Sequence, residues 1–291
     1  MDQRVRIGNA GNGLSDDGMG VMIKHLLTII GVYAMWMLGI TYPHMPGAHD
    51  PMAVPLSTVL QVGVVVSLLW MPIGIVWVIA VWQQRATPWL GRVLGFMAMV
   101  SSGVLAVVGY ASGGVFFGVI VAVVAGMCLR WVWRQAAFAA RGAVYLVAMP
   151  VCAMATLIGI ATPVTDSSRA HAIAQSQPLI DDLADYYARN QRYPVSLQAM
   201  YHDYPVGVVG VARYYYVPSA TAYNLMYEQP RFLLDDIGTR EWVVYNPRDE
   251  HRIYSHDSWI LLLSATQLSQ SQGWYANEPT EYSHWRVFLF D

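Results

Sequence analysis

Two clusters of histidine and aspartate are the first residues of this sequence that could do chemistry. Both combine imidazole with carboxylate, and they are His44, His49 and Asp50 in the first half, and His251, His256 and Asp257 near the end. A zinc site needs three or four converging ligands, commonly at short spacings such as His-x3-His on a helix. Neither cluster has that spacing. We therefore expect loop histidines, with no metal and no cofactor.

Other catalytic patterns are equally incomplete. Asp181, Asp182 and Asp185 could be a paired-carboxylate site, but at one helical turn they more simply form the solvated face of an amphipathic helix. The chain has no Gly-x-Ser-x-Gly elbow, and the glycines of residues 8–13 precede no strand pattern, as a phosphate loop would require. An enzyme is possible on this sequence, but no motif supports one.

Tyrosines form the more suggestive group, because they fall on short segments that we predict to be strands. They are Tyr214, Tyr215, Tyr216, Tyr223, Tyr227, Tyr245 and Tyr254. Strand alternation must point some of them away from the core, and exposed tyrosines suit a protein-binding face. The alternative is that one face covers a helix and the other touches lipid headgroups.

The elements that must position these residues follow from composition. Of the 291 residues 55% are hydrophobic and only 12% charged, against about 25% charged in an average soluble domain. Residues 1–162 carry 4 acidic side chains and residues 163–291 carry 15. We divide the chain into a polar arm (residues 1–20), a transmembrane domain (21–162) and an outer domain (163–291). The composition excludes an ordinary cytosolic enzyme, and a net charge of −2 without a basic run argues against nucleic acid.

Five segments are apolar and near the roughly 20 residues that a helix needs to cross a bilayer. They are residues 21–42, 57–82, 93–110, 115–132 and 143–162. The predicted fold class is a multi-pass α-helical membrane bundle of five spans, followed by an α+β domain. Both cysteines, Cys128 and Cys152, fall inside spans, so we expect the outer domain to have no disulfide.

Lys and Arg are retained on the cytoplasmic side of membranes, so the connections give an orientation. The basic residues lie in the amino-terminal arm, the second connection and the fourth; they are Arg4, Arg6 and Lys24, then Arg85 and Arg92, then Arg130, Arg134 and Arg141. The first connection (43–56) and the third (111–114) have none. We predict a bacterial inner-membrane protein with a cytoplasmic amino terminus and a periplasmic carboxy-terminal domain.

Proline and glycine inside the spans have structural roles in this interpretation. Pro72 and Pro150 are expected to kink their helices, as neighbouring helices tolerate in membranes. Gly114 and Gly118 lie four residues apart, where the missing side chains let another backbone approach closely. The four-residue connection forces the third and fourth spans to be neighbours, so we expect packing within the bundle rather than a dimer.

The outer domain begins with a helical pattern and continues with strand patterns. Asp166, Ser167 and Ser168 offer helix caps, and Pro178 predicts a kink or restart before the helix ends in residues 190–194. Residues 212–217, 222–227, 241–245, 252–255 and 285–290 predict an antiparallel meander, and residues 258–269 could be strand or helix. A long helix packed on a small antiparallel sheet buries both apolar faces.

One motif resembles a known family. The segment Tyr-Tyr-Ala-Arg-Asn-Gln-Arg-Tyr-Pro-Val-Ser-Leu-Gln-Ala-Met at residues 186–200, after a membrane helix and before strands, resembles the domain of type IV pilins and type II secretion pseudopilins. The resemblance implies that Tyr193 packs the helix end onto the sheet, Pro194 stops the helix, and Leu197 forms an apolar turn. Four predicted spans precede this helix and no prepilin peptidase site does, so only the fold is inferred.

These observations predict a non-enzymatic membrane protein that presents a periplasmic domain to a protein partner. The partner could be an effector that an immunity protein neutralises, or a component of a secretion or pilus machine. The alternative is an envelope enzyme or lipid-handling protein, whose site lies between the mouth of the bundle and the outer domain. The lipid bilayer is a partner in either case, and the sequence leaves the oligomeric state open.

Overall fold

A computed structural model describes residues 16–83, 88–134, 140–200, 202–219, 221–235, 239–253, 263–264 and 276–290. Its internal contacts separate Met1–Leu38 from Gly39–Asp291, so the two units are considered individually. The first unit contains most of one apolar helix. The second unit contains the other helices and the sheet, and every contact discussed below lies within it.

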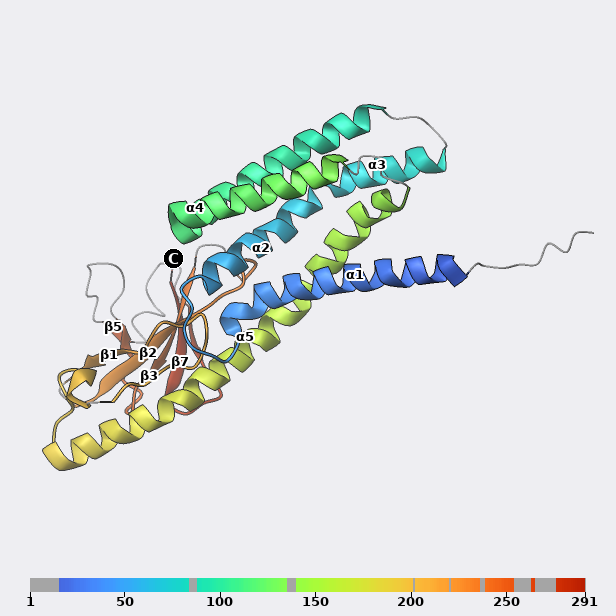
Figure 1. The fold of residues 1–291 in the computed structure, drawn as a ribbon. Helices are drawn as coiled ribbons and strands as arrows, with labels where there is room; N and C mark the ends of the chain where they lie inside the picture. Colours follow the sequence, from blue (N-terminus) through green and yellow to red (C-terminus); the bar gives the residue numbers. More distant parts are fainter. Residues whose placement is uncertain are drawn as a thin grey trace, which may run out of the picture. The chain divides into compact units, whose positions relative to one another are not determined.

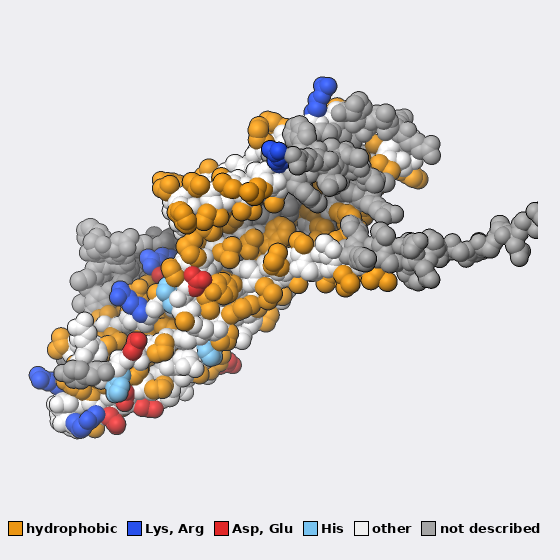
Figure 2. Space-filling model, in the orientation of Figure 1, with side chains coloured by type: hydrophobic (Ala, Val, Ile, Leu, Met, Phe, Trp, Pro, Cys, Tyr) orange, Lys and Arg blue, Asp and Glu red, His pale blue; other side chains and the backbone are white. Residues whose placement is uncertain are grey.

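Five helices account for most of the described residues (Figure 1). They are α1 (Asp16–Thr41), α2 (Ala53–Leu68), α3 (Met71–Trp82), α4 (Pro88–Arg134) and α5 (Ala140–Asn190), with the short 3-10 helices η1 (Tyr42–His44) and η2 (Leu197–Met200). In the second unit α3 packs against α5, and α2 packs against α4 and α5. Apolar side chains cover the helices on the face shown in Figure 2, whereas charged side chains gather over the sheet and the second half of α5.

The prediction of five spans is not met. Among the described residues, three helices are long and apolar enough to cross a membrane: Leu26–His44, Arg92–Cys128 and Val144–Asn190. The pair α2 and α3 makes a fourth if it counts as one span broken by a 45° bend. The count differs because the segments predicted at residues 93–110 and 115–132 follow one another without a gap in α4, although Gly114 divides them into two helical stretches.

Gly114 interrupts α4. Its φ of 78° and ψ of −177° are not helical, so two helical stretches meet at this residue. The stretches lie side by side, since a Cβ added to Gly118 would come within 2.8 Å of the Tyr110 Cβ. This close approach agrees with the expectation that residues 93–110 and 115–132 are neighbours.

Prolines occupy two kinds of position in these helices. Pro72 lies in the first turn of α3, where its missing N–H costs no hydrogen bond, so it marks a helix start after the break at Leu69 and Trp70. Pro150 and Pro178 both lie inside the continuous helix α5. The predicted restart at Pro178 is therefore wrong; the ring lies on an exposed face, where water can satisfy the carbonyl that loses its donor.

The proposed caps are also wrong. Asp166, Ser167 and Ser168 are interior residues of α5, which runs without a break from the bundle into the outer domain. Apolar packing on both sides explains the continuity, because a helix held by tertiary contacts does not need a local start signal. Its end is as expected: Asn190 is the last residue, and Gln191 follows with a φ of 54°.

The sheet has five antiparallel strands in the order β1-β2-β3-β7-β6. Their bounds are β1 (Tyr215–Pro218), β2 (Tyr223–Gln229), β3 (Arg240–Tyr245), β6 (Ala276–Pro279) and β7 (Trp285–Phe290), and β4 (Arg252–Ile253) pairs separately with β5 (Leu263–Ser264). The first three strands form the predicted meander. The last strand returns beside β3, which a simple meander does not include.

The second half of α5 packs on the sheet and closes the core, as the α+β prediction requires. Leu179 and Leu183 of α5 are fully buried against Leu225, Tyr227 and Val243 of the sheet. Polar side chains occupy the same interface around residues 166–169 of α5. The fold class is thus confirmed in its coarse form, helices with a small antiparallel sheet in the carboxy-terminal part.

The turn after α5 packs as the pilin-like motif implies. The Tyr193 ring lies 4.6 Å from the Tyr187 ring and 4.9 Å from the Tyr223 ring. Pro194 is buried, and its carbonyl accepts a hydrogen bond from the Tyr216 hydroxyl at 2.9 Å. Leu197 is partly buried against the core. These contacts hold the end of α5 on the sheet.

The first connection is part of the outer domain. Its backbone pairs with residues 207–210: Pro46 bridges to Val208, Gly47 N donates to Gly207 O at 2.8 Å, and Asp50 N donates to Val209 O at 2.9 Å. A loop predicted only as a link between two spans therefore forms a β-bridge and backbone hydrogen bonds with the domain about 160 residues later.

Candidate functional site

Most of the predicted tyrosine face points inward. Tyr214, Tyr223 and Tyr227 are 6%, 2% and 0% exposed, and Tyr216 and Tyr245 pack against the same core. The register explains this, because Tyr216, Leu225, Tyr245 and Trp285 are successive cross-strand partners on the side that faces α5. Tyr214, Tyr223 and Tyr227 are therefore core residues, whereas Tyr216 and Tyr245 are partly buried and pack against that core. Tyr254 lies outside the described residues.

Tyr215 is the exception, because it points to the opposite side of β1. Its ring lies 5.1 Å from the Trp242 ring, and the Arg213 guanidinium carbon lies 4.8 Å above it. Arg240 stands 5.6 Å from the Trp242 ring in the same way. The outer face of the sheet thus carries two aromatic rings flanked by two arginines.

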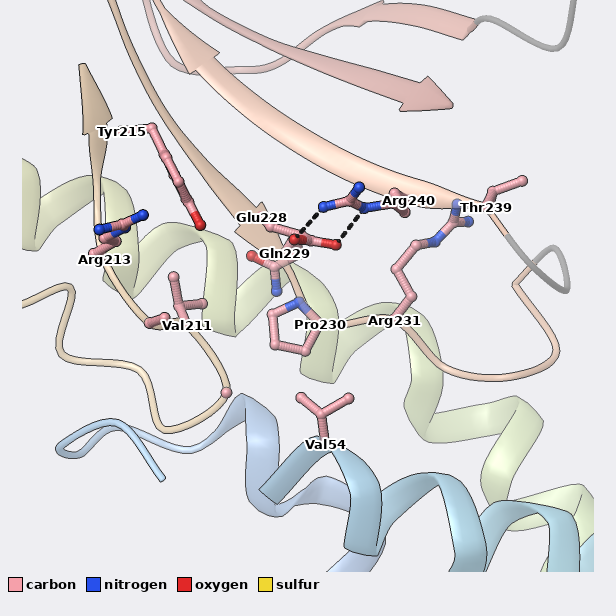
Figure 3. Close-up of a pocket in the computed structure, with 12 residues that line it drawn as sticks. Val54, Val211, Arg213, Tyr215, Glu228, Gln229, Pro230, Arg231, Thr239 and Arg240 are labelled. Carbon is pink, nitrogen blue, oxygen red and sulfur yellow. Dashed lines mark hydrogen bonds and ion pairs between the residues drawn. The ribbon is translucent and has the colours of Figure 1, made fainter. Parts of the chain in front are cut away.

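A pocket opens beside these residues, between one end of the sheet and the start of α2 (Figure 3). Its volume is about 370 Å³. It is lined by Val54 from α2, by the segment from Gly210 to Arg213, by Tyr215, by the segment from Glu228 to Arg231, and by Thr239 and Arg240. Three guanidinium groups and one carboxylate therefore surround one cavity.

The three arginines are not equivalent. Arg240 is held by Glu228 through two hydrogen bonds of 2.8 and 2.9 Å. Arg231 donates to Thr239 and to the Asp235 carbonyl, and lies 3.7 Å from Glu241. Arg213 is exposed and makes no ion pair with any residue in the described part of the chain. Arg213 is therefore the positive charge of the pocket that an entering anion could neutralise.

The wall on the bundle side is apolar. Val54 is 42% exposed in the first turn of α2, and Pro230 faces it across the pocket (Figure 3). Gly210 closes the floor, because a Cβ there would come within 2.6 Å of Pro230 and 2.7 Å of the Pro43 carbonyl oxygen. The cations thus come from the domain, and the apolar surface is shared between Val54 of α2 and domain residues such as Val211 and Pro230.

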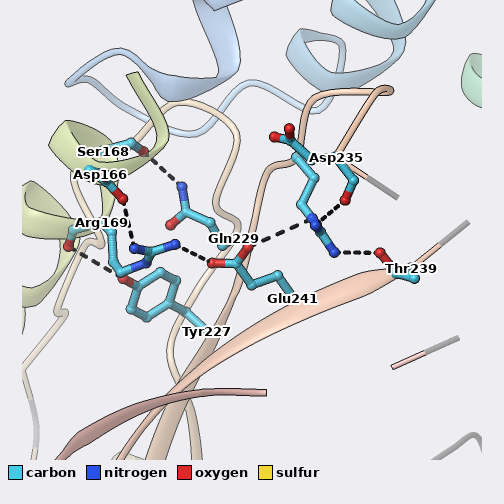
Figure 4. A network of polar contacts seen from close by, with 9 residues as sticks. Asp166, Ser168, Arg169, Tyr227, Gln229, Asp235, Thr239 and Glu241 are labelled. Atoms are coloured by element: carbon cyan, nitrogen blue, oxygen red, sulfur yellow. Dashed lines mark hydrogen bonds and ion pairs between the residues drawn. The ribbon is translucent and has the colours of Figure 1, made fainter. Parts of the chain in front are cut away.

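Behind the pocket, a charge network ties the sheet to α5 (Figure 4). Glu241, 6% exposed in its side chain, accepts a 2.8 Å hydrogen bond from Arg169, which also pairs with Asp166 at 2.9 Å. Beside it the Gln229 amide donates to Ser168 at 3.2 Å, and both residues are buried. Arg231 belongs both to this network and to the pocket.

The segment that carries Arg231 is anchored in the bundle. Phe232 is 1% exposed and stacks on His44 with ring centroids 4.6 Å apart. The Leu233 N–H donates to Gln61 Oε1 of α2 at 2.7 Å, and Gln61 donates in turn to Ser57. These contacts fix the lower edge of the pocket relative to α2.

Burial governs the ionisation of the domain. It raises the pKa of Tyr214, Tyr216 and Tyr223, so these phenols stay neutral. Burial, together with a hydrogen bond to Asp182, raises the pKa of Tyr204 to about 12. Burial also lowers the pKa of His251, which keeps that imidazole neutral. None of these shifts creates a general base near the pocket.

The described histidines and aspartates of the predicted clusters make separate structural contacts and do not form one site. The His49 Nδ1 lies 3.1 Å from the Val209 carbonyl oxygen, and Asp50 accepts from the Tyr42 hydroxyl at 3.0 Å. Asp181 and Asp185 are exposed on α5. Within the residues that the structure describes, no three His, Cys, Asp or Glu side chains are grouped as metal ligands; His256 and Asp257 lie outside that part.

The pocket residues were missed from the sequence. Arg213 and Tyr215 are two positions apart, so the alternation of a strand could have placed them on one face. Nothing local links them to Val54, which is more than 150 residues earlier and reaches the site through the pairing of the first connection.

Comparison with known proteins adds no assignment. No protein-family model matches this chain, no curated protein matches it, and no solved structure matches it. The pilin-like fold therefore stays a prediction from residues 186–200.

Proposed function

We propose that this protein is a membrane-anchored binding protein, whose pocket at the mouth of the bundle takes an acidic ligand. The proposal is based on one observation: three arginines line a cavity of about 370 Å³, and Arg213 has no carboxylate partner among the described residues. Ligand sites commonly combine an apolar wall with a few convergent polar groups. This is the site between bundle and domain that the sequence offered as its alternative.

The chemistry of the lining favours binding over catalysis. Guanidinium groups stay protonated and cannot act as bases, whereas their planar fork suits carboxylate and phosphate. Glu228, the carboxylate of the lining, is occupied by Arg240. The set can hold and orient an anion, but it supplies no group to activate a nucleophile.

We also propose the predicted orientation, with the pocket outside the cytoplasmic membrane. The backbone bonds between residues 43–50 and 207–210 support it, because they require the first connection and the outer domain to lie on one side of the membrane. The first connection is also free of Lys and Arg, as is typical of non-cytoplasmic loops.

A photo-crosslinking amino acid at position 54 tests the binding site in cells. We expect a discrete crosslinked product at Val54 that disappears when Arg213→Gln is introduced. The matched control is position 195, because Val195 is 88% exposed beyond the end of α5. Products that are the same at both positions, or that persist without Arg213, would contradict the proposal.

A second candidate is the protein partner expected from the sequence, and one observation favours it. Tyr215 and Trp242, flanked by Arg213 and Arg240, are the residue types that dominate protein interfaces. Affinity capture with the full chain, compared with a Trp242→Ala variant, tests this candidate. A partner retained equally by both proteins would place its contact elsewhere.

A further inference from the structure

We propose that the ligand of the pocket is the phosphodiester headgroup of an anionic phospholipid, with its acyl chains along α2. This inference rests on the proposed binding function and names the ligand class. Its basis is the depth of the pocket, the separation of charge from apolar surface, and the chemistry of Arg213.

The pocket lies at the depth of the lipid headgroups. If α2 and α3 form one broken span with α3 along the bilayer normal, the 12 residues of α3 rise about 18 Å. After the 45° bend α2 rises about 1.1 Å per residue, so the remaining ~12 Å of a ~30 Å hydrocarbon core ends near Thr58. Val54 then lies about 4 Å above the hydrocarbon, inside a headgroup layer of about 5–7 Å.

The contacts of α2 agree with this level. Gln61, one turn below Thr58, has its amide satisfied by Ser57 and by the Leu233 backbone. Polar groups at the edge of the hydrocarbon need such internal partners. Above it, Met52, Val54 and Leu56 are 38%, 42% and 37% exposed, which provides apolar surface where the glycerol and upper acyl chain of a lipid would lie.

The second step is polarity. The lining carries three arginines on the domain side, Arg213, Arg231 and Arg240, and an apolar pair, Val54 of α2 and Pro230 of the domain opposite it (Figure 3). A free phosphate or a small acid would use the first group and leave the second idle. A phospholipid whose phosphate meets the arginines sends its chains toward the bilayer, past Val54.

The third step is the anchor. Arginine binds phosphate oxygens in a bidentate way, and Arg213 is the arginine of the lining that no described carboxylate neutralises. The ring of Tyr215 beneath it holds the guanidinium at the pocket rim. Arg231 and Arg240 add positive potential while keeping their own partners.

The experiment uses the full chain in nanodiscs of phosphatidylcholine, with or without phosphatidylglycerol, and counts retained lipids by native mass spectrometry. We expect the wild type to retain phosphatidylglycerol, and Arg213→Gln to bind it about tenfold more weakly, the loss of one charge-assisted contact. Arg189→Gln is the matched control, because it removes the same charge from the exposed far end of α5. Val54→Glu should also lower retention by placing a carboxylate beside the acyl chains.

The outcomes separate the two proposals. Retention that falls in Arg213→Gln and Val54→Glu but not in Arg189→Gln supports the lipid assignment. Glycerol 3-phosphate that stabilises the wild type without any lipid preference overturns the lipid assignment and leaves the acidic-ligand site standing. An acidic protein that binds through Arg213 in place of lipid would also overturn the lipid assignment and leave the acidic-ligand site standing. Retention unchanged in Arg213→Gln overturns both, provided that the variant melts like the wild type.

Discussion

Replacing Glu241 by glutamine tests whether the buried charge network joins α5 to the sheet. The Glu241 carboxylate lies 2.8 Å from Arg169 and 3.7 Å from Arg231, and glutamine keeps its size while removing the charge that both guanidinium groups share. Breaking a buried ion pair costs about 3–5 kcal/mol. Because the Arg169 side chain is 20% exposed and keeps Asp166, we expect a loss of about 2–3 kcal/mol in the free energy of unfolding.

Glu228→Gln is the matched control. It makes the same change on the neighbouring strand, where Glu228 also lies 2.8 Å from an arginine, but the Arg240 and Glu228 side chains are 45% and 41% exposed. An exposed pair contributes about 0–1 kcal/mol. Thermal unfolding of the full chain in mild detergent should show Tm lower by about 4–12 °C for Glu241→Gln, and by less than about 4 °C for Glu228→Gln. Equal losses would refute the argument that burial sets the strength of these pairs.

Three further outcomes are expected. Tyr193→Ala should destabilise the full chain by about 2–4 kcal/mol, since it removes a partly buried ring from the end of α5, whereas Tyr215→Ala on the outer face should cost about 1 kcal/mol; the order of their melting temperatures checks this. Burial lowers the pKa of His251, so as the pH falls below about 6.5 this imidazole takes up a proton in the unfolded chain before it does so in the folded protein. The melting temperature should therefore be lower at pH 5.5 than at pH 7.5, and the difference should be smaller in His251→Gln. In cells whose two native cysteines are replaced, an impermeant maleimide should label Ala48→Cys and spare Arg85→Cys, and the reverse pattern would invert the proposed orientation.

Local patterns predicted the elements of the outer domain well. Alternating aromatic and β-branched residues located the core of β1, β2, β3 and β7 but not β6, and the Tyr193-Pro194 pair marked the end of α5, because both signals act over a few residues. The face of the tyrosines was harder. A run of three consecutive tyrosines alternates sides, but only pairing with β2 shows that Tyr214 and Tyr216 face α5 while Tyr215 does not.

Long-range features were beyond the sequence. Helix caps at Asp166 and a restart at Pro178 are sound local signals, yet α5 passes through both because tertiary packing outweighs them. The pocket is lined jointly by Val54, Gly210 and Arg240, whose separations in the sequence no periodicity encodes. The pairing of residues 43–50 with residues 207–210 brings them together.

The pairing of residues 43–50 with residues 207–210 also constrains the order of folding. Pro46 leaves the ribosome long before Val208, so this edge of the domain stays unpaired until residues 207–210 have been made and, in the proposed orientation, have crossed the membrane. Closing a loop of this length is entropically costly, and the large sequence separation of the contact raises the contact order, which slows folding. Biogenesis should therefore end with the capture of the first outer loop by the last-made domain, and a chain truncated before residue 207 should leave that loop open to proteolysis.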